Sequence, residues 1–66
     1  MQIQLNGCDF ELPDGTTVAD LLAAQDLLGR RVAVELNLDI VPRSQHASTV
    51  LKENDCVEVV HAIGGG

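Results

Sequence analysis

The sequence has few basic residues. Four lysines and arginines stand against ten aspartates and glutamates among 66 residues, which gives a net charge of −6 at pH 7. Because phosphate backbones and anionic lipid surfaces repel such a chain, the composition argues against nucleic-acid and membrane partners. A protein partner with a basic docking face suits this charge better.

Long apolar segments are also missing. The longest uninterrupted apolar run covers only residues 21–24, whereas a membrane-spanning helix needs about 20 such residues. Residues 1–4 contain neither a basic region nor a long apolar stretch, so no signal peptide is predicted. We therefore expect a cytoplasmic protein.

Cysteine is scarce, and its spacing excludes two kinds of site. Cys8 and Cys56 are too few for a disulfide scaffold and form no C-x-x-C pair. His46 and His61 have no zinc-ligand spacing to either cysteine, so no metal site is predicted. We expect both cysteines to be free thiols, His46 to be a surface histidine in a polar loop, and His61 to lie on the last strand.

Catalytic motifs are absent too. The ten carboxylates are spread along the chain without an evident pair, and Ser44 and Ser48 have no adjacent histidine and acid that suggest a triad. A chain this short buries only about 60% of the surface its unfolded form exposes, which leaves little room for a deep cleft. The sequence therefore predicts a protein that is not itself an enzyme.

Apolar and polar residues alternate over 1–5, 9–12, 32–36 and 56–63, the period of half-buried strands, and a short strand is predicted at 40–41. Asn6-Gly7 predicts a hairpin turn between the first two strands. Thr17 with Asp20 predicts a capped start for a helix over 18–28, which Gly29 would end. Residues 43–51 read as a loop with one helical turn.

This order predicts an α+β fold: a mixed sheet of four to five strands with one main helix packed on one face. The apolar last strand is expected in the centre, parallel to the first. Val57 and Val59 should then face the core, and Glu58 and Val60 the opposite side. We assign one domain to residues 1–63 and a flexible glycine tail to residues 64–66.

The tail Gly64-Gly65-Gly66 has two interpretations. No helix follows it, so it is not a phosphate-binding loop at a helix N-terminus. It is either a frayed terminus or an added remnant, or a functional end. In the functional case, the lack of side chains lets Gly64 and Gly65 thread a narrow channel, and no Cβ obstructs attack on the carbonyl of Gly66.

Segments along the whole chain carry a resemblance to a known family. They are IQLNG at 3–7, LPDGTTVADLL at 12–22, VAVELN at 32–37, IVPRS at 40–44 and DCVEVV at 55–60, followed by Gly65-Gly66. Together they resemble the ThiS family of sulfur carriers in the ubiquitin-like β-grasp superfamily. The chain departs from the family at Leu38 and Asn54, where glycine is frequent, so the geometry of those two turns is open.

The resemblance implies a chemistry for the tail. A ThiF-like adenylyltransferase would use ATP and magnesium to adenylate the carboxylate of Gly66. Sulfur from a sulfurtransferase or cysteine desulfurase would then displace AMP and leave a thiocarboxylate, which donates its sulfur to the thiazole synthase ThiG in thiamin biosynthesis. The chain would bind no cofactor, would act as a co-substrate, and would work in the bacterial cytoplasm.

Recognition by these partners has to come from the folded surface. By alternation Ala33 and Val60 point to the free face of the sheet, with Ile63 close to the tail, so we predict a small apolar docking patch there. Glu35 and Glu58 would form its acidic rim.

Three other functions remain open on the sequence. One is a sulfur carrier for molybdopterin or cysteine biosynthesis. The second is a ubiquitin-like modifier that is conjugated to lysines, and the third is an interaction module with an inert tail.

Overall fold

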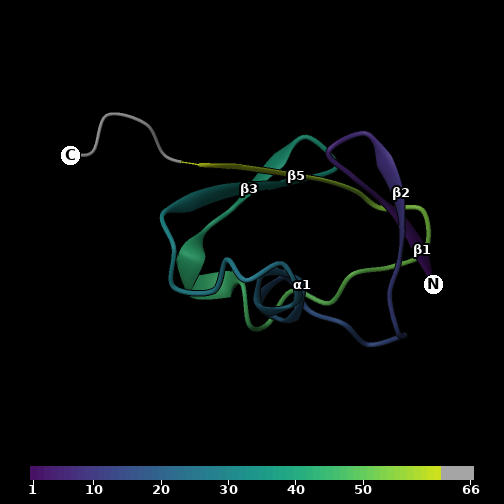
Figure 1. Cartoon of the computed structure of the whole chain (residues 1–66), viewed down its shortest axis with the longest axis horizontal. Helices are drawn as coiled ribbons and strands as arrows, with labels where there is room; N and C mark the ends of the chain where they lie inside the picture. Colours follow the sequence, from purple (N-terminus) through teal and green to yellow (C-terminus); the bar gives the residue numbers. More distant parts are fainter. Residues whose placement is uncertain (62–66) are drawn as a thin grey trace.

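A mixed sheet and a single helix make up the part of the chain that the computed structural model describes, residues 1–61 (Figure 1). The elements in chain order are β1 (Gln2–Leu5), β2 (Cys8–Glu11), α1 (Val18–Ala24), β3 (Val32–Leu36), β4 (Asp39–Val41), the 3₁₀ turn η1 (Arg43–Gln45) and β5 (Cys56–His61). The five strands lie in the order β2-β1-β5-β3-β4. The pair β1–β5 is parallel and the other pairs are antiparallel. The predicted α+β fold, with the last strand central and parallel to the first, is confirmed.

The β1–β2 hairpin follows from its turn residues. Asn6 and Gly7 have φ angles of 50° and 84°, the left-handed region that both central residues of the common hairpin turn require. Leu5 therefore lies opposite Cys8, and Ile3 opposite Phe10. This register places Ile3 and Phe10 on the same side of the sheet.

Helix α1 begins as the sequence predicts. The Asp20 amide donates to Oγ1 of Thr17, and the Thr17 amide donates to Oδ2 of Asp20, both at 3.1 Å. This reciprocal pair is a capping box, with aspartate in the position where glutamate is more common. It satisfies two amide groups that the first helical turn leaves without a carbonyl partner.

The predicted end of the helix is wrong. Helix α1 stops at Ala24, four residues before the predicted end at residue 28. Asp26 adopts φ 60°, and the Leu27 amide donates to the Leu22 carbonyl at 2.7 Å. This arrangement closes the helix three residues before Gly29. Leu27 then packs against the core, while Leu28 is 62% exposed.

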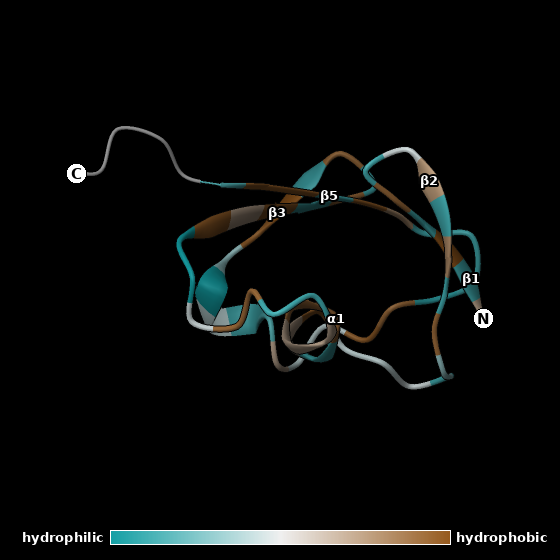
Figure 2. Cartoon of the chain, in the orientation of Figure 1, coloured by the Kyte–Doolittle hydropathy of each residue, from teal (hydrophilic) through white to brown (hydrophobic). Residues whose placement is uncertain are grey.

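The hydrophobic core lies between α1 and one face of the sheet. Figure 2 shows α1 facing the sheet, with hydrophobic stretches in the strands. It contains nine buried apolar residues: Ile3, Leu12, Val18, Leu21, Leu22, Val34, Val41, Leu51 and Val57. They come from the strands, from α1 and from the loops that flank it. The opposite face of the sheet has no covering layer among residues 1–61 (Figure 1).

Two turns depart from ordinary backbone angles where the sequence lacks glycine. Asn37 and Leu38, between β3 and β4, have φ angles of 51° and 75°. Asparagine tolerates this region, but the leucine side chain is strained in it. Asn54 adopts φ 69° before β5. Both turns keep their left-handed geometry although the expected glycines are absent.

Candidate functional site at the end of strand β5

Strand β5 is the element that leads to the predicted reactive end of the chain. It is the middle strand of the sheet, and its last described residue is His61. Gly64, Gly65 and Gly66, the predicted tail, lie outside the described residues. The same holds for Ile63, the third predicted residue of the docking patch. The structure therefore describes the base of the site rather than the reacting group.

The two sides of β5 are covered to different lengths. Strand β3 pairs with β5 from Val57 to His61, whereas β1 pairs only at Cys56 and Val57. Just past the end of β1, Oδ1 of Asn6 accepts a hydrogen bond from the Val59 amide at 2.8 Å. Among residues 1–61, no strand covers this side of β5 beyond that point. The final part of β5 is thus bordered by a strand on the β3 side alone.

The free face of the sheet carries two of the predicted docking residues side by side. Ala33 and Val60 are direct cross-strand partners on β3 and β5. Both are exposed, Val60 to 56% of its surface. Figure 2 shows the hydrophobic stretches of β3 and β5 running next to each other. The geometry brings these two predicted residues together close to the end of β5.

Sequence reasoning missed one apolar residue of this face. Ile40 on β4 is exposed and lies opposite Glu35 on β3. Its neighbour Val41 lies opposite Val34 in the core, so alternation could have placed Ile40 on the free face. Ile40 therefore joins the predicted Ala33 and Val60, and from here on the name docking patch means these three described residues.

The acidic rim of the docking patch consists of two facing carboxylates. Glu35 on β3 and Glu58 on β5 are direct cross-strand partners. Like charges placed opposite each other destabilise a sheet by a few tenths of a kcal/mol or more. A positively charged partner residue between them would relieve this repulsion. The rim therefore fits the basic docking face that the net charge of the chain suggests.

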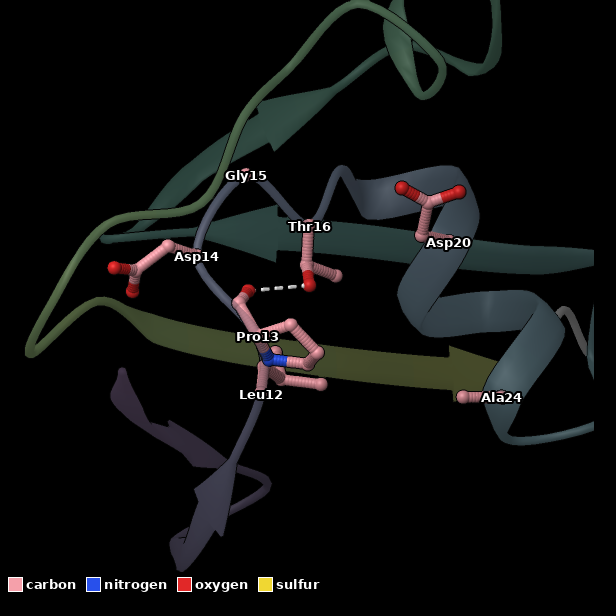
Figure 3. Close-up of a pocket in the computed structure, with 7 residues that line it drawn as sticks. All are labelled: Leu12, Pro13, Asp14, Gly15, Thr16, Asp20 and Ala24. Atoms are coloured by element: carbon pink, nitrogen blue, oxygen red, sulfur yellow. Dashed lines mark hydrogen bonds between the residues drawn. The ribbon is translucent and has the colours of Figure 1, made fainter.

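A hollow lies at the start of α1. It has a volume of about 420 Å³ and is lined by Asp14, Thr16 and Asp20, among others. Figure 3 shows the two carboxylates pointing away from each other, and Oγ1 of Thr16 donates to the Pro13 carbonyl at 2.6 Å. Asp20 is engaged in the helix cap. This hollow contains no pair of carboxylates placed to share one reacting atom.

Comparison with known proteins decides the family. The ThiS family model matches residues 3–66, and a crystal structure of the thiamine biosynthesis protein ThiS from Geobacter metallireducens superposes with a TM-score of 0.87 at 30% identity, with both chains fully covered. The chain belongs to the ThiS family. Its fold is accordingly the ubiquitin-like β-grasp that the resemblance implied.

Relatives of this ThiS-family chain differ in length. The sulfur carrier protein ThiS of Bacillus subtilis is 38% identical over 65 residues, which cover 97% of this chain and 98% of that protein. A thiazole synthase of Magnetococcus marinus is 44% identical over all 66 residues. The chain spans only 20% of the length of that thiazole synthase.

The prediction that His46 is a surface histidine is wrong. In this ThiS-family chain it is only 8% exposed, and its Nε2 lies 3.0 Å from the Val41 carbonyl oxygen. The His46 carbonyl in turn accepts a hydrogen bond from the Ala19 amide of α1. The histidine is therefore a buried link between the loop after β4 and the helix. His61, in contrast, is exposed on β5.

The remaining groups add no metal or membrane site to the described part of this ThiS-family chain. In residues 1–61, no three histidine, cysteine or acidic side chains gather closely enough to hold a metal ion. The same stretch has no helix with the length and apolar character needed to cross a bilayer. Cys8 and Cys56 are free thiols, as predicted, and both are exposed.

Proposed function

We propose that this chain is a sulfur carrier for thiazole formation in thiamin biosynthesis, with the carboxylate of Gly66 as the group that carries sulfur. The observation that carries the proposal is the ThiS family match, which runs through Gly66. The match to the Bacillus subtilis sulfur carrier along nearly its whole length adds support. Under this proposal the folded domain addresses the tail to partner enzymes and contributes no acid or base of its own.

The first step activates the tail. The Gly66 carboxylate attacks the α-phosphorus of ATP, pyrophosphate leaves, and an acyl-adenylate forms. A ThiF-like adenylyltransferase supplies the ATP site, and magnesium bound there neutralises the phosphates. Activation is needed because a free carboxylate has no good leaving group, whereas the adenylate departs as AMP. Because the step consumes ATP, we place the chain in the bacterial cytoplasm.

The second step exchanges oxygen for sulfur. A persulfide on a sulfurtransferase or cysteine desulfurase attacks the acyl carbon through its terminal sulfur and displaces AMP. A second thiol then cleaves the resulting acyl disulfide, which leaves the thiocarboxylate on Gly66 and a disulfide on the donor side. Two electrons from the thiols balance the cleavage of the sulfur–sulfur bond.

The acceptor is a thiazole synthase of the ThiG type. Support comes from the Magnetococcus marinus thiazole synthase, which contains a stretch 44% identical to this whole chain. A relative that joins such a stretch to a thiazole synthase suggests that the separate proteins also meet. The thiocarboxylate sulfur would act as the nucleophile that enters the thiazole ring.

The docking patch supplies the recognition surface in this proposal. Ala33, Ile40 and Val60 offer exposed apolar contacts, and Glu35 with Glu58 offer charge to a basic partner surface. Ile63, outside the described residues, is proposed to extend the patch toward the tail. Gly64 and Gly65 are proposed to pass through the narrow entrance of the partner's active site.

The decisive experiment is an intact mass measurement. The chain is incubated with the ThiF-like enzyme, ATP, magnesium and a sulfur source, and a second sample lacks ATP. We expect a mass gain equal to the exchange of one oxygen for one sulfur, located at Gly66 by fragmentation. An unchanged mass with an enzyme that activates a known ThiS protein would contradict the proposal. Covalent conjugates to lysines would favour a protein modifier instead.

A matched variant tests the position of the reacting carboxylate. A protease-cleavable extension after Gly66 should abolish thiocarboxylate formation, because the carboxylate then sits at another residue. Removal of the extension should restore it. Sulfur transfer to the uncut extended chain would show that the Gly66 carboxylate is not the acceptor. Equal melting temperatures of the two forms would show that the loss does not come from unfolding.

A further inference from the structure

A second hollow lies on the helix side of the sheet, away from the docking patch. Its volume is about 210 Å³. Ala19 and Leu22 of α1 and Val32 of β3 form part of its apolar lining, and Arg30, Arg43 and His46 contribute the polar part. We call it the arginine hollow. Apolar walls with a few placed polar groups are typical of sites that take up a specific side chain or ligand.

The charge of the arginine hollow opposes that of the rest of the molecule. The chain has four lysines and arginines and ten acidic residues, yet two of those arginines line this one hollow. Within residues 1–61, neither Arg30 nor Arg43 has a carboxylate within salt-bridge distance. Their positive charge is therefore available to a group from outside the described chain.

Hydrogen bonds hold the walls of the hollow in place. Nη2 of Arg43 donates to the Arg30 carbonyl at 3.1 Å, which joins the η1 segment to the connection after α1. His46 is anchored by the contact of its Nε2 with the Val41 carbonyl and by its own carbonyl on the Ala19 amide. The two arginines are thus presented together by segments that the fold fixes, although they are 13 residues apart.

The hollow lies next to the strand that leads to the tail. Val32, which lines it, is the direct cross-strand partner of His61, the last described residue of β5. Neighbouring strands are about 4.8 Å apart. Val32 and Ala33 point to opposite faces of the sheet. The arginine hollow and the docking patch therefore lie on opposite faces, both beside the end of β5.

We propose that the arginine hollow is a second docking site, and that it receives an aspartate or glutamate side chain of the enzyme that activates the tail. The charge of the hollow favours a carboxylate, and arginine binds carboxylates through two parallel hydrogen bonds. Its position favours a residue at the entrance through which that enzyme draws in Gly64–Gly66. The inference rests on the proposed function, because it assumes that such an enzyme takes up the tail.

Charge reversal at Arg30 tests the arginine hollow. Arg30→Glu leaves the backbone carbonyl that holds Arg43 in place. Lys52→Glu is the matched control, since it changes the net charge equally but lies in the turn before β5, at the other end of the β3–β5 pair. The dissociation constant for the ThiF-like enzyme is measured by calorimetry at low and at physiological salt, with melting temperatures as a check on folding.

We expect Arg30→Glu to weaken binding roughly 10-fold at low salt, because it places like charges against each other. The loss should shrink as salt rises. Lys52→Glu should leave the dissociation constant within about 2-fold, since a charge far from the interface acts weakly through solvent. Equal losses in both variants would show a general charge effect and overturn the proposal, and so would no loss in Arg30→Glu.

Two further measurements distinguish this inference from the proposed function and from binding of a small anion. Thiocarboxylate formation by the unaltered chain reports on the proposed function alone, so its failure is distinct from an unchanged affinity of Arg30→Glu. Inorganic phosphate is titrated into the isolated chain and followed by NMR. Saturable shifts confined to Arg30, Arg43 and His46 at submillimolar phosphate would assign the hollow to a small anion and overturn the docking proposal.

Discussion

Two valines of the same strand have opposite surroundings. Val57 is 1% exposed and packs in the core between the sheet and α1, whereas Val60, three residues later, lies on the open face of the sheet. Because both residues are valine, the difference comes from position alone. The comparison shows that alternation along one strand places one valine where it stabilises the domain and leaves the other exposed, where we propose that it contacts partners.

The two faces of the sheet also differ in what their residues contribute to the stability of the domain. The helix-side face is filled by apolar side chains that lose their contact with water. The open face keeps apolar residues in water and places Glu35 directly opposite Glu58. Neither feature helps the isolated domain. This difference supports the proposal that the open face binds partner proteins.

The largest expected effect separates binding from folding on the open face. Val60→Asp should slow adenylation by the ThiF-like enzyme roughly 100-fold, because an unpaired charge buried in an apolar contact costs several kcal/mol. Its melting temperature should stay close to that of the unaltered chain. Gln2→Asp on β1, on the same face but away from the patch, is the control and should adenylate normally. Normal adenylation kinetics for Val60→Asp would contradict the proposal that the docking patch binds this enzyme.

The next effect tests the helix-side face. Val57→Ala should lower the free energy of unfolding by about 2 kcal/mol, since it removes two buried methyl groups and leaves a cavity. The matched change Val60→Ala should stay within about 0.5 kcal/mol. Urea denaturation measures both. Equal losses in the two variants would mean that the faces do not differ in their contribution to stability.

The smallest effect comes from a residue that belongs to neither face. Leu38 is 86% exposed and adopts φ 75°. Leu38→Gly should raise the free energy of unfolding by about 0.5–1 kcal/mol, because it removes the strain of the left-handed backbone and loses little burial. Leu38→Ala keeps the strain and should bring no gain. A gain with alanine would trace the effect to the exposed side chain.

Features set by neighbouring residues could be predicted from the sequence. The alternation of residues 56–61 correctly assigned Val57 to the core and Val60 to the open face. The hairpin at Asn6-Gly7 and the cap at Thr17 were predictable because each depends on residues within one turn of the backbone. The thiocarboxylate site at Gly66 stays a prediction from the family resemblance.

Features decided by distant contacts were missed. Both Asp26 and Gly29 can adopt a left-handed angle and end α1, and the packing of Leu27 on the core accompanies the earlier stop. His46 has polar neighbours in the sequence, yet the fold buries it between α1 and the Val41 carbonyl. The arginine hollow likewise joins segments that no local pattern relates.

The parallel pairing of β1 and β5 has a mechanical consequence. A force that pulls Met1 and His61 apart acts along both strands in opposite directions. It loads the hydrogen bonds from the Gln4 amide to Asp55 and from the Asn6 amide to Val57, each 2.9 Å long, in shear. Such bonds share the load and have to break together. An unfolding machine that pulls along this axis would therefore meet its main resistance at the β1–β5 pair.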